Sequence, residues 1–201
     1  MSFRDNHFNW LEEIIIPAID LFYAEPKDQD LIARNASERA IAANIYFKAN
    51  AYLAQKKDTN QGMDDLVIDI EYNRNAEGSK EVFVKCGFCD KHDCFINQKH
   101  LQYTTSSPDM VIHHRGFNDN NQVVIEFKKV SNRNNKERDD DKAKLIYFTC
   151  QRKYLEHNEV DYQYHTGYFI DLGIDRYFVT TYQDTAYDDP RCRQGGVWLD
   201  N

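Results

Sequence analysis

The sequence predicts an α/β protein, in which helices flank a central mixed sheet of the α+β type. Apolar side chains recur at every third or fourth residue in some segments and at every second residue in others. These helical and strand patterns alternate along the chain, as expected when helices cover the faces of a sheet. With 201 residues, the chain is long enough to bury a core without disulfides. We therefore expect residues 1–201 to form a single domain.

Net charge and the lengths of the apolar runs argue against two classes of protein. A formal charge of −8 disfavours a surface that binds any polyanion, because Lys and Arg supply most of the affinity for phosphate backbones. Apolar runs such as Ile14 to Ile16 are far shorter than the roughly 20 residues that span a membrane. Met1 is not followed by a basic and then apolar leader. We expect a cytoplasmic protein that does not bind membranes.

Positive charge is nevertheless concentrated in one stretch. From Lys128 to Lys153 the chain carries nine basic residues and four acidic ones. This local excess suits either contact with phosphate groups or a solvated surface, and the pattern leaves both interpretations open.

Two helices are predicted near the N-terminus. The segment Asn9 to Tyr23 has apolar residues at helical spacing and is expected to bend at Pro17. Residues 25–28 are interpreted as a connector, so residues 1–35 are expected to form an N-terminal helical extension. The next helix is predicted from Ala36 to Gln55, with Asn35 as its N-cap.

Glu38 in this helix allows two interpretations. It follows Asn35 by three residues, which is the spacing of a capping box and requires no function. It also lies in line with Ile41, Ile45 and Ala49 on the apolar face of the helix. A carboxylate on the core-facing side of a helix favours a place in a functional site.

The segment Asp65 to Tyr72 alternates between apolar and polar residues and is predicted to be a strand. Its apolar side chains share one face, while Asp69 and Glu71 share the other. A half-exposed strand explains these two acids without a function, although they are also candidates to approach a metal site. Residues 73–79 are expected to form a turn, and residues 81–85 a returning strand.

Two apolar strands are predicted in the middle of the chain. They cover Met110 to Ile112 and Val123 to Lys128, and the polar segment between them predicts a hairpin. Glu126 and Lys128 are two residues apart and therefore point to the same face of a strand built mostly of Val, Ile and Phe. Because an unpaired buried charge costs several kcal/mol, these two side chains predict a pairing or a bound cation.

A known motif resembles this hairpin. Pro108-Asp109, sixteen residues and then Glu126-Phe127-Lys128 is similar to the signature of the PD-(D/E)xK nuclease superfamily. The strand that reads Asp69-x-Glu71-Tyr72-Asn-Arg is similar to one in a group of bacterial and phage members. Over residues 36–172 the resemblance implies a restriction-endonuclease-like core with the element order αβββαβ.

The resemblance also implies a chemistry. It implies a metal-dependent nuclease that hydrolyses phosphodiester bonds of nucleic acid, DNA rather than RNA, with Mg²⁺ or Mn²⁺ as cofactor and a homodimer as a possible assembly. Lys128 would assist the attack of water or stabilise the phosphoryl oxygens, and Lys144 would contact a phosphate. The implied metal ligands are Asp109, Glu126, the backbone carbonyl of Phe127, and Glu38.

A cluster of cysteine and histidine residues precedes the hairpin. Soft ligands of this kind hold zinc tetrahedrally, although their spacing is closer than in common zinc folds. Structural Zn²⁺ and reduced loop cysteines are therefore both open, and His100 is an alternative ligand. We treat residues 86–103 as an insertion. The candidate zinc ligands are Cys86, Cys89, His92 and Cys94.

The last third of the chain is predicted to hold one helix and two strands. Residues 131–140 are expected to form a polar loop, and Asp141 to His157 a helix that turns Leu145 and Phe148 inward. Strands are expected over residues 161–172 and 176–182, followed by an irregular segment over residues 186–201.

Two other functions compete with a nuclease. The first is a nuclease-fold protein that has become a binding module for nucleic acid or protein; the four charged motif positions argue against it, whereas the negative net charge leaves room for a protein partner. Alternatively, Cys86 to Cys94 forms the centre of a zinc-stabilised interaction domain, and Glu126 and Lys128 are an ordinary ion pair. Metal content and metal-dependent cleavage separate these interpretations.

Overall fold

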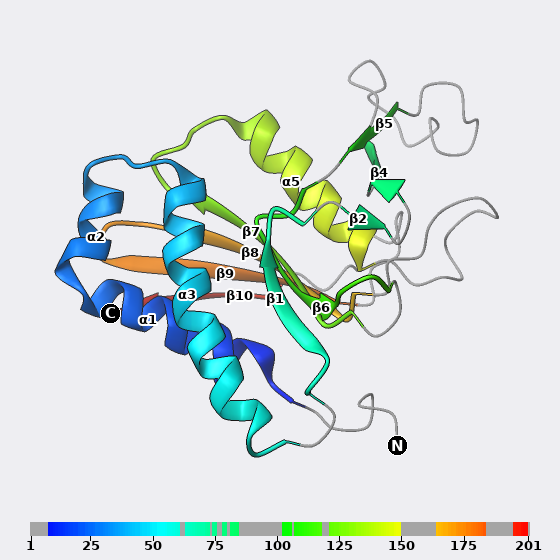
Figure 1. Ribbon diagram of the computed structural model, residues 1–201. Helices are drawn as coiled ribbons and strands as arrows, with labels where there is room; N and C mark the ends of the chain where they lie inside the picture. The colour runs from blue at the N-terminus through cyan, green and yellow to red at the C-terminus, as the bar shows by residue number, and fades with distance from the viewer. Residues whose placement is uncertain are drawn as a thin grey trace.

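The core of the molecule is a six-stranded mixed sheet with helices on both faces (Figure 1). The structure is a computed structural model that describes residues 8–60, 63–72, 107–117, 121–149 and 164–183, together with the backbone of five short strands. This architecture confirms the predicted class, a mixed sheet flanked by helices. The strands in spatial order are β1 (Leu66–Ile70), β6 (Met110–His114), β7 (Val123–Lys129), β8 (Thr166–Leu172), β9 (Arg176–Gln183) and β10 (Gly195–Asp200).

The sheet is antiparallel except at its centre. β6 and β7 form the predicted hairpin pair, with Met110 opposite Ile125, whereas β7 and β8 are parallel. Parallel neighbours need a crossover connection. Helix α5 (Asn135–Phe148) lies in that connection. Two separate two-stranded sheets contain β2 (Arg74–Asn75) with β3 (Gly78–Ser79), and β4 (Glu81–Val84) with β5 (Gln102–Thr105).

Alternate residues of β7 divide the core between two helical layers. Ile125 and Phe127 pack with the N-terminal helices, while Val124 packs with Leu145 and Phe148 of α5. Figure 1 shows α3 crossing in front of the strands and α5 lying above them. The N-terminal layer contains a π-helical segment (Leu11–Ile15), α1 (Ile16–Ala24), α2 (Pro26–Ala33) and α3 (Glu38–Lys57).

The N-terminal helices differ from the prediction in two places. Residues 25–28 are not a connector, because Pro26 begins α2; proline favours the first helical position, where its missing N–H has no partner to lose. The first predicted helix contains a π-helical segment that ends at Ile15, two residues before Pro17. Proline has no N–H to donate to a helical hydrogen bond, which favours irregular hydrogen bonding in the turn before it, and the predicted bend at Pro17 stays a prediction.

The start of α3 also corrects the prediction. Ser37, not Asn35, is the N-cap, and its Oγ accepts a hydrogen bond from the backbone N–H of Ala40 at 3.2 Å. Asn35 instead has a positive φ of 58° in the turn after α2, a conformation that Asn tolerates. Glu38 is therefore the first residue of the helix, so the predicted capping box is absent and the Glu38 carboxylate has other partners.

Helix α5 starts six residues before the predicted helix. Asn134 caps it by accepting a hydrogen bond from the backbone N–H of Glu137, so most of the predicted loop at 131–140 is helical. Leu145 and Phe148 point inward as predicted. The helix ends at Phe148 rather than at His157, and residues 150–163 lie outside the described part of the chain.

The C-terminal segment adds an edge strand. Residues 195–200 form β10, which pairs with β9, although the sequence predicted an irregular segment there. Its two adjacent glycines are weak strand formers, and the pairing with β9 outweighs this weakness. The strand predicted from residue 161 begins at Thr166 in the described residues.

The described helices include none that is long and apolar enough to cross a membrane.

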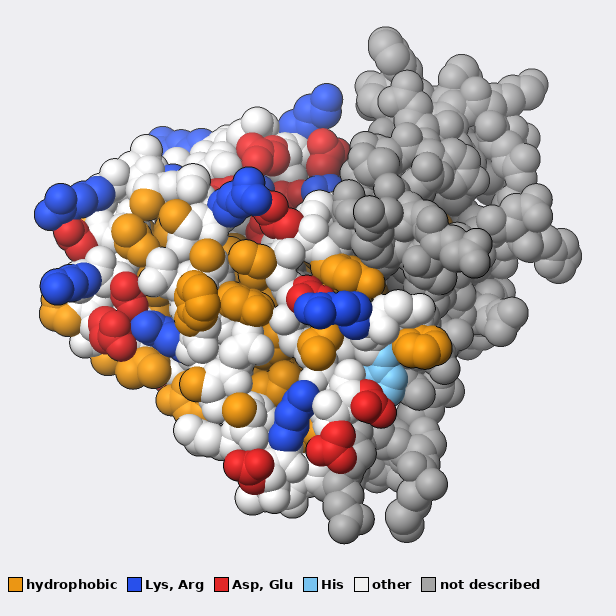
Figure 2. All heavy atoms as spheres, in the orientation of Figure 1, with side chains coloured by type: hydrophobic (Ala, Val, Ile, Leu, Met, Phe, Trp, Pro, Cys, Tyr) orange, Lys and Arg blue, Asp and Glu red, His pale blue; other side chains and the backbone are white. Residues whose placement is uncertain are grey.

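Figure 2 shows hydrophobic side chains at the surface on the face that carries α3, with charged side chains around them. Phe47 of α3 is 71% exposed and Phe117 is 65% exposed. Single exposed aromatic residues are common on protein surfaces, so we assign them no role.

Candidate functional site

The candidate site lies where β6 and β7 separate. Their pairing ends at Met110 and Ile125. In the part of β7 after Ile125, two carboxylates accept hydrogen bonds from the backbone edge that β6 no longer pairs with. The backbone N–H of Phe127 donates to Asp109 Oδ2 at 2.7 Å, and that of Lys129 donates to Glu38 Oε1 at 3.1 Å. Side chains from the loop before β6 and from the start of α3 thus take the place of a neighbouring strand.

The backbone carbonyl of Phe127 faces the same edge. In an extended strand, the N–H and C=O groups of one residue point to the same side, which is why paired residues exchange both bonds. The N–H of Phe127 is directed at Asp109, so its carbonyl oxygen also points toward the space that β6 has left. This orientation is the one that the predicted role of the carbonyl as a ligand requires.

Asp109 and Glu126 form a close carboxyl pair. Their side chains share a hydrogen bond, and burial raises the pKa of Asp109 to about 6, with Asp141 adding to the effect. Glu126 is 3% exposed, and burial followed by the charges of Asp109 and Asp141 raises its pKa well above the usual value. Two buried carboxyl groups cannot both ionise cheaply, so the pair retains a proton unless a cation replaces it.

Glu126 also has an unused ligand atom. Among the described residues, its buried Oε1 has no hydrogen-bond partner. A buried carboxylate oxygen without a partner costs free energy, and such atoms in native proteins mark strain, catalysis or a missing ion. The hard oxygen atoms of this pair suit Mg²⁺ or Mn²⁺.

Lys128 lies on the same face of β7 as Glu126 and is surrounded by carboxylates. Its Nζ is 2.8 Å from Asp141 Oδ2, 3.1 Å from Glu38 Oε2 and 3.1 Å from Glu137 Oε1. Burial alone lowers the pKa of a lysine, but hydrogen bonds and charge interactions with Asp141 and Glu38 outweigh it and raise the pKa of Lys128. The surrounding carboxylates therefore favour the charged form of the ammonium group.

Asp141 is a site residue that the sequence analysis missed. It is 4% exposed and bridges two lysines, with Oδ2 on Lys128 and Oδ1 at 2.6 Å from Lys144 Nζ. The sequence analysis predicted that the helix starts at Asp141, so this residue was interpreted as part of the helix N-terminus and not as part of the site. A signal was present, because Glu137, Asp141 and Leu145 recur at four-residue spacing and so share one face of α5.

Lys144 lies in this cluster rather than on the open surface. Burial lowers its pKa, but the charge of Glu126 and the hydrogen bond to Asp141 raise it by more. Its ammonium lies beside the carboxyl groups, 2.6 Å from Asp141, and its contact with a phosphate stays a prediction.

The tertiary structure thus brings together all four of the residues predicted to be catalytic. They come from the start of α3, the loop before β6 and strand β7, and α5 adds Asp141 and Glu137. The described part of the chain contains no ready-made group of three or more His, Cys, Asp or Glu side chains around a metal position. The predicted zinc ligands Cys86, Cys89, His92 and Cys94 lie outside the described residues.

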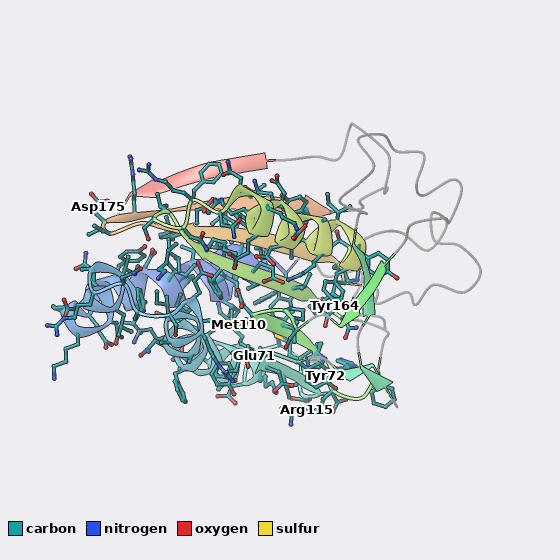
Figure 3. All side chains as sticks on the ribbon, turned by 90° about the horizontal axis from the view of Figure 1, so that it is seen from above. Glu71, Tyr72, Met110, Arg115, Tyr164 and Asp175 are labelled. Carbon is teal, nitrogen blue, oxygen red and sulfur yellow. The ribbon has the colours of Figure 1, made fainter. Side chains whose placement is uncertain are left out.

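A second polar cluster lies at the other end of β6. His113 is fully buried, and its Nε2 is 3.0 Å from Asp69 Oδ2, which also accepts a hydrogen bond from Arg115 Nε at 3.0 Å. Burial raises the pKa of Asp69, but hydrogen bonds from His113 and Arg115 lower it by more. Figure 3 shows Glu71, Tyr72 and Arg115 near one another at the end of β1. Asp69 was predicted to lie on a half-exposed face of its strand, but its side chain is only 14% exposed. The pairing with His113 and Arg115 compensates the burial of its charge.

Comparisons with known proteins do not identify a family. The chain matches no protein-family model, no curated protein and no solved structure. The function therefore has to be inferred from the site.

Proposed function

We propose that this protein is a metal-dependent nuclease with a restriction-endonuclease-like core, and that it hydrolyses phosphodiester bonds of DNA. The observation that carries the proposal is the cluster at the edge of β7. There Asp109 and Glu126 form a buried carboxyl pair with an orphaned oxygen, and Lys128 lies on the same face beside Asp141. An ordinary surface ion pair would need neither the burial nor the second carboxyl group.

The element order supports the fold part of the proposal. The elements that form the centre of the structure follow one another along the chain as α3, β1, β6, β7, α5 and β8. This order fits the αβββαβ core that the motif implies, with β2 to β5 and residues 86–101 inserted between its first two strands. Asp109 directly precedes β6, and Glu126 and Lys128 lie on β7, which pairs with β6 in antiparallel fashion.

The carboxyl groups and one carbonyl would hold the cation. Asp109, Glu126 and the carbonyl of Phe127 are the proposed ligands, and Glu38 approaches from α3 along the same edge. When bound, Mg²⁺ supplies two effects: it lowers the pKa of an attacking water and neutralises charge on the phosphate. Its charge would also remove the cost of keeping both buried carboxylates ionised.

Lys128 would act on the phosphate. Its ammonium group stays protonated, because Asp141 and Glu38 surround it, and is therefore a fixed positive charge rather than a base. Such a preorganised charge stabilises the extra negative charge of the transition state and needs no reorganisation during the reaction. Asp141 would be a positioning residue that holds Lys128 and Lys144 in place.

The decisive experiment is a cleavage assay on single- and double-stranded DNA and RNA with Mg²⁺, Mn²⁺ or EDTA. We expect wild type to cut DNA with either cation, and Asp109→Asn and Lys128→Ala to lower the rate at least about 100-fold, as removal of one group that stabilises a transition state does. Asp30→Asn is the matched control, because Asp30 is an exposed carboxylate that pairs with Arg34 on α2. Its rate is expected to equal that of wild type.

Two outcomes would redirect the assignment. Cleavage in EDTA, or equal loss in the Asp30 control, would contradict a metal site at β7. Absence of cleavage together with absence of Mn²⁺ binding by calorimetry would favour a binding module that has kept the fold without the reaction.

A further inference from the structure

Three carboxylates crowd the ammonium group of Lys128, each within 3.1 Å, so a substrate has to compete with them. A lysine has three N–H donors, and Lys128 has three carboxylate partners, on Glu38, Asp141 and Glu137. Any phosphate that contacts this ammonium must therefore displace one carboxylate. The three candidates differ in how firmly each is held.

Glu38 and Asp141 are held by further contacts. The side chain of Glu38 is 19% exposed, and it also accepts a hydrogen bond from the backbone N–H of Lys129. The side chain of Asp141 is 6% exposed, and its other oxygen contacts Lys144 at 2.6 Å. Removing either from Lys128 would strand a buried carboxylate, which is costly.

Glu137 differs from both. Its side chain is 47% exposed, and its second oxygen is 3.5 Å from Asn132 Nδ2, the long limit for a hydrogen bond. Its backbone N–H is held by the cap residue Asn134, so the side chain can rotate away while the helix stays intact. Exposed ion pairs of this kind stabilise little. Glu137 is thus the partner that an incoming anion displaces most easily.

We propose, on the basis of the nuclease function above, that Glu137 occupies the phosphate subsite of this protein and competes with the substrate phosphate for Lys128 and Asn132. The carboxylate binds as an anion would, with one oxygen on the ammonium and the other toward the amide. Substrate binding replaces it with phosphate oxygens, and the displaced carboxylate moves into solvent. Glu137 therefore weakens binding of every phosphate ligand without taking part in the chemistry.

A surface pocket beside these residues has room for such a ligand. It has a volume of about 370 Å³ and is lined by Asn35, Glu38, Lys129, Ser131 and Asn132. On the same measure, about 10 to 15 Å³ is enough to hold one water molecule. Glu38 and Asn132 both line the pocket and contact the Lys128 and Glu137 pair. A phosphate bound at Lys128 can thus extend into it with the rest of a nucleotide chain.

The test is titration calorimetry with inorganic phosphate, carried out with Mg²⁺ and again with EDTA, on wild type, Glu137→Gln and Asp139→Asn. Glu137→Gln is expected to bind phosphate about fivefold more tightly, the factor that corresponds to an exposed ion pair of about 1 kcal/mol. Asp139 is an exposed carboxylate of the same helix, so Asp139→Asn changes the net charge equally. Its affinity is expected to stay within about twofold of wild type, and Asn132→Ala is expected to bind more weakly than wild type.

The inference is overturned if wild type and Glu137→Gln bind phosphate with equal affinity, or if neither binds it detectably. It is also overturned if Asp139→Asn gains as much phosphate affinity as Glu137→Gln. The cleavage assay separates this inference from the nuclease proposal. Tighter phosphate binding in Glu137→Gln without cleavage by any variant would keep the subsite and reject the nuclease. Cleavage by wild type with unchanged phosphate affinity in Glu137→Gln would keep the nuclease and reject the subsite.

Discussion

The two faces of β7 differ sharply in chemistry. The face toward α3 is apolar until its last residue, Lys129, with Val123, Ile125 and Phe127 all fully buried. The face toward α5 starts with Val124 in an apolar cluster and then presents Glu126 and Lys128, which are 3% and 6% exposed. One strand thus contributes to the hydrophobic core on one side and to a charged cluster on the other.

The difference shows how one strand can serve both stability and function. Burial of apolar area stabilises the fold without regard to pH, whereas a buried charged cluster stabilises or destabilises according to which groups hold protons. A buried ion cluster is weak evidence for stability, so its retention here favours a functional reason. Three consecutive residues, Glu126, Phe127 and Lys128, allow the comparison to be tested within one strand.

The largest effect is expected on the apolar face. Phe127→Ala should lower the free energy of unfolding by about 4 kcal/mol, since it removes a fully buried ring and leaves a cavity. Urea denaturation at pH 5 and pH 8 measures the loss, which is expected to be equal at both. Phe47→Ala is the control, because Phe47 of α3 is 71% exposed and its truncation should cost under about 0.5 kcal/mol. Similar losses in the two variants would contradict the assigned core.

Lys128→Met is expected to cost about 3 kcal/mol of stability at pH 8, because it leaves buried carboxylates without their cation. At pH 5 the loss should be smaller by about 1 kcal/mol. The pKa of Asp109 is about 6, so below that pH its carboxyl carries a proton and one buried charge fewer remains uncompensated. Urea denaturation in EDTA measures both values.

Lys48→Met is the comparison variant for this prediction. Lys48 is 12% exposed and forms ion pairs with Glu25 and Asp28, away from the cluster. Equal pH profiles for the Lys48 and Lys128 variants would show that the carboxyl pair does not set the pH dependence.

The smallest effect should have the opposite sign. Without metal, wild type loses stability as the pH rises through about 6, because the folded carboxyl pair holds a proton that the unfolded chain has released above about pH 4. Glu126→Gln removes one of the two acids and should raise the free energy of unfolding at pH 8 by about 1 to 2 kcal/mol. At pH 5 the gain should be close to zero.

Thermal unfolding in EDTA checks this sign. Glu12→Gln, at an exposed position of the first helix, is the charge-matched control and should leave the melting temperature unchanged. A destabilised Glu126→Gln at pH 8 would mean that the Glu126 carboxylate is compensated in the absence of metal, and the argument from its orphaned oxygen would fail.

Local signals predicted the parts of the fold that depend on neighbouring residues. The hairpin of β6 and β7, the strand β1 and most of α3 follow from apolar periodicity, and the shared face of Glu126 and Lys128 follows from strand geometry. Errors occurred where local signals compete. Asn35 and Ser37 are both good caps, and the charged start of α5 resembles a solvated loop as much as a helix.

Asp141 shows the limit for site residues. Its place in a charged run made it look solvated, and its burial depends on how α5 packs on β7 rather than on its neighbours in sequence. Strand β10 is a similar case. Its glycines weaken the local preference for a strand, and it forms because it pairs with β9, which lies next to it only in the folded protein.

By itself, the sequence determined which side chains were available and which face of β7 each would occupy, because alternation is a property of the extended backbone. The tertiary structure decided which charges meet. Glu38 and Lys128 are 90 residues apart in sequence and 3.1 Å apart in space, a contact that no local pattern encodes. It also decided the protonation of the site, because the pKa values of Asp109 and Glu126 are raised mainly by burial, and burial exists only after the layers have packed.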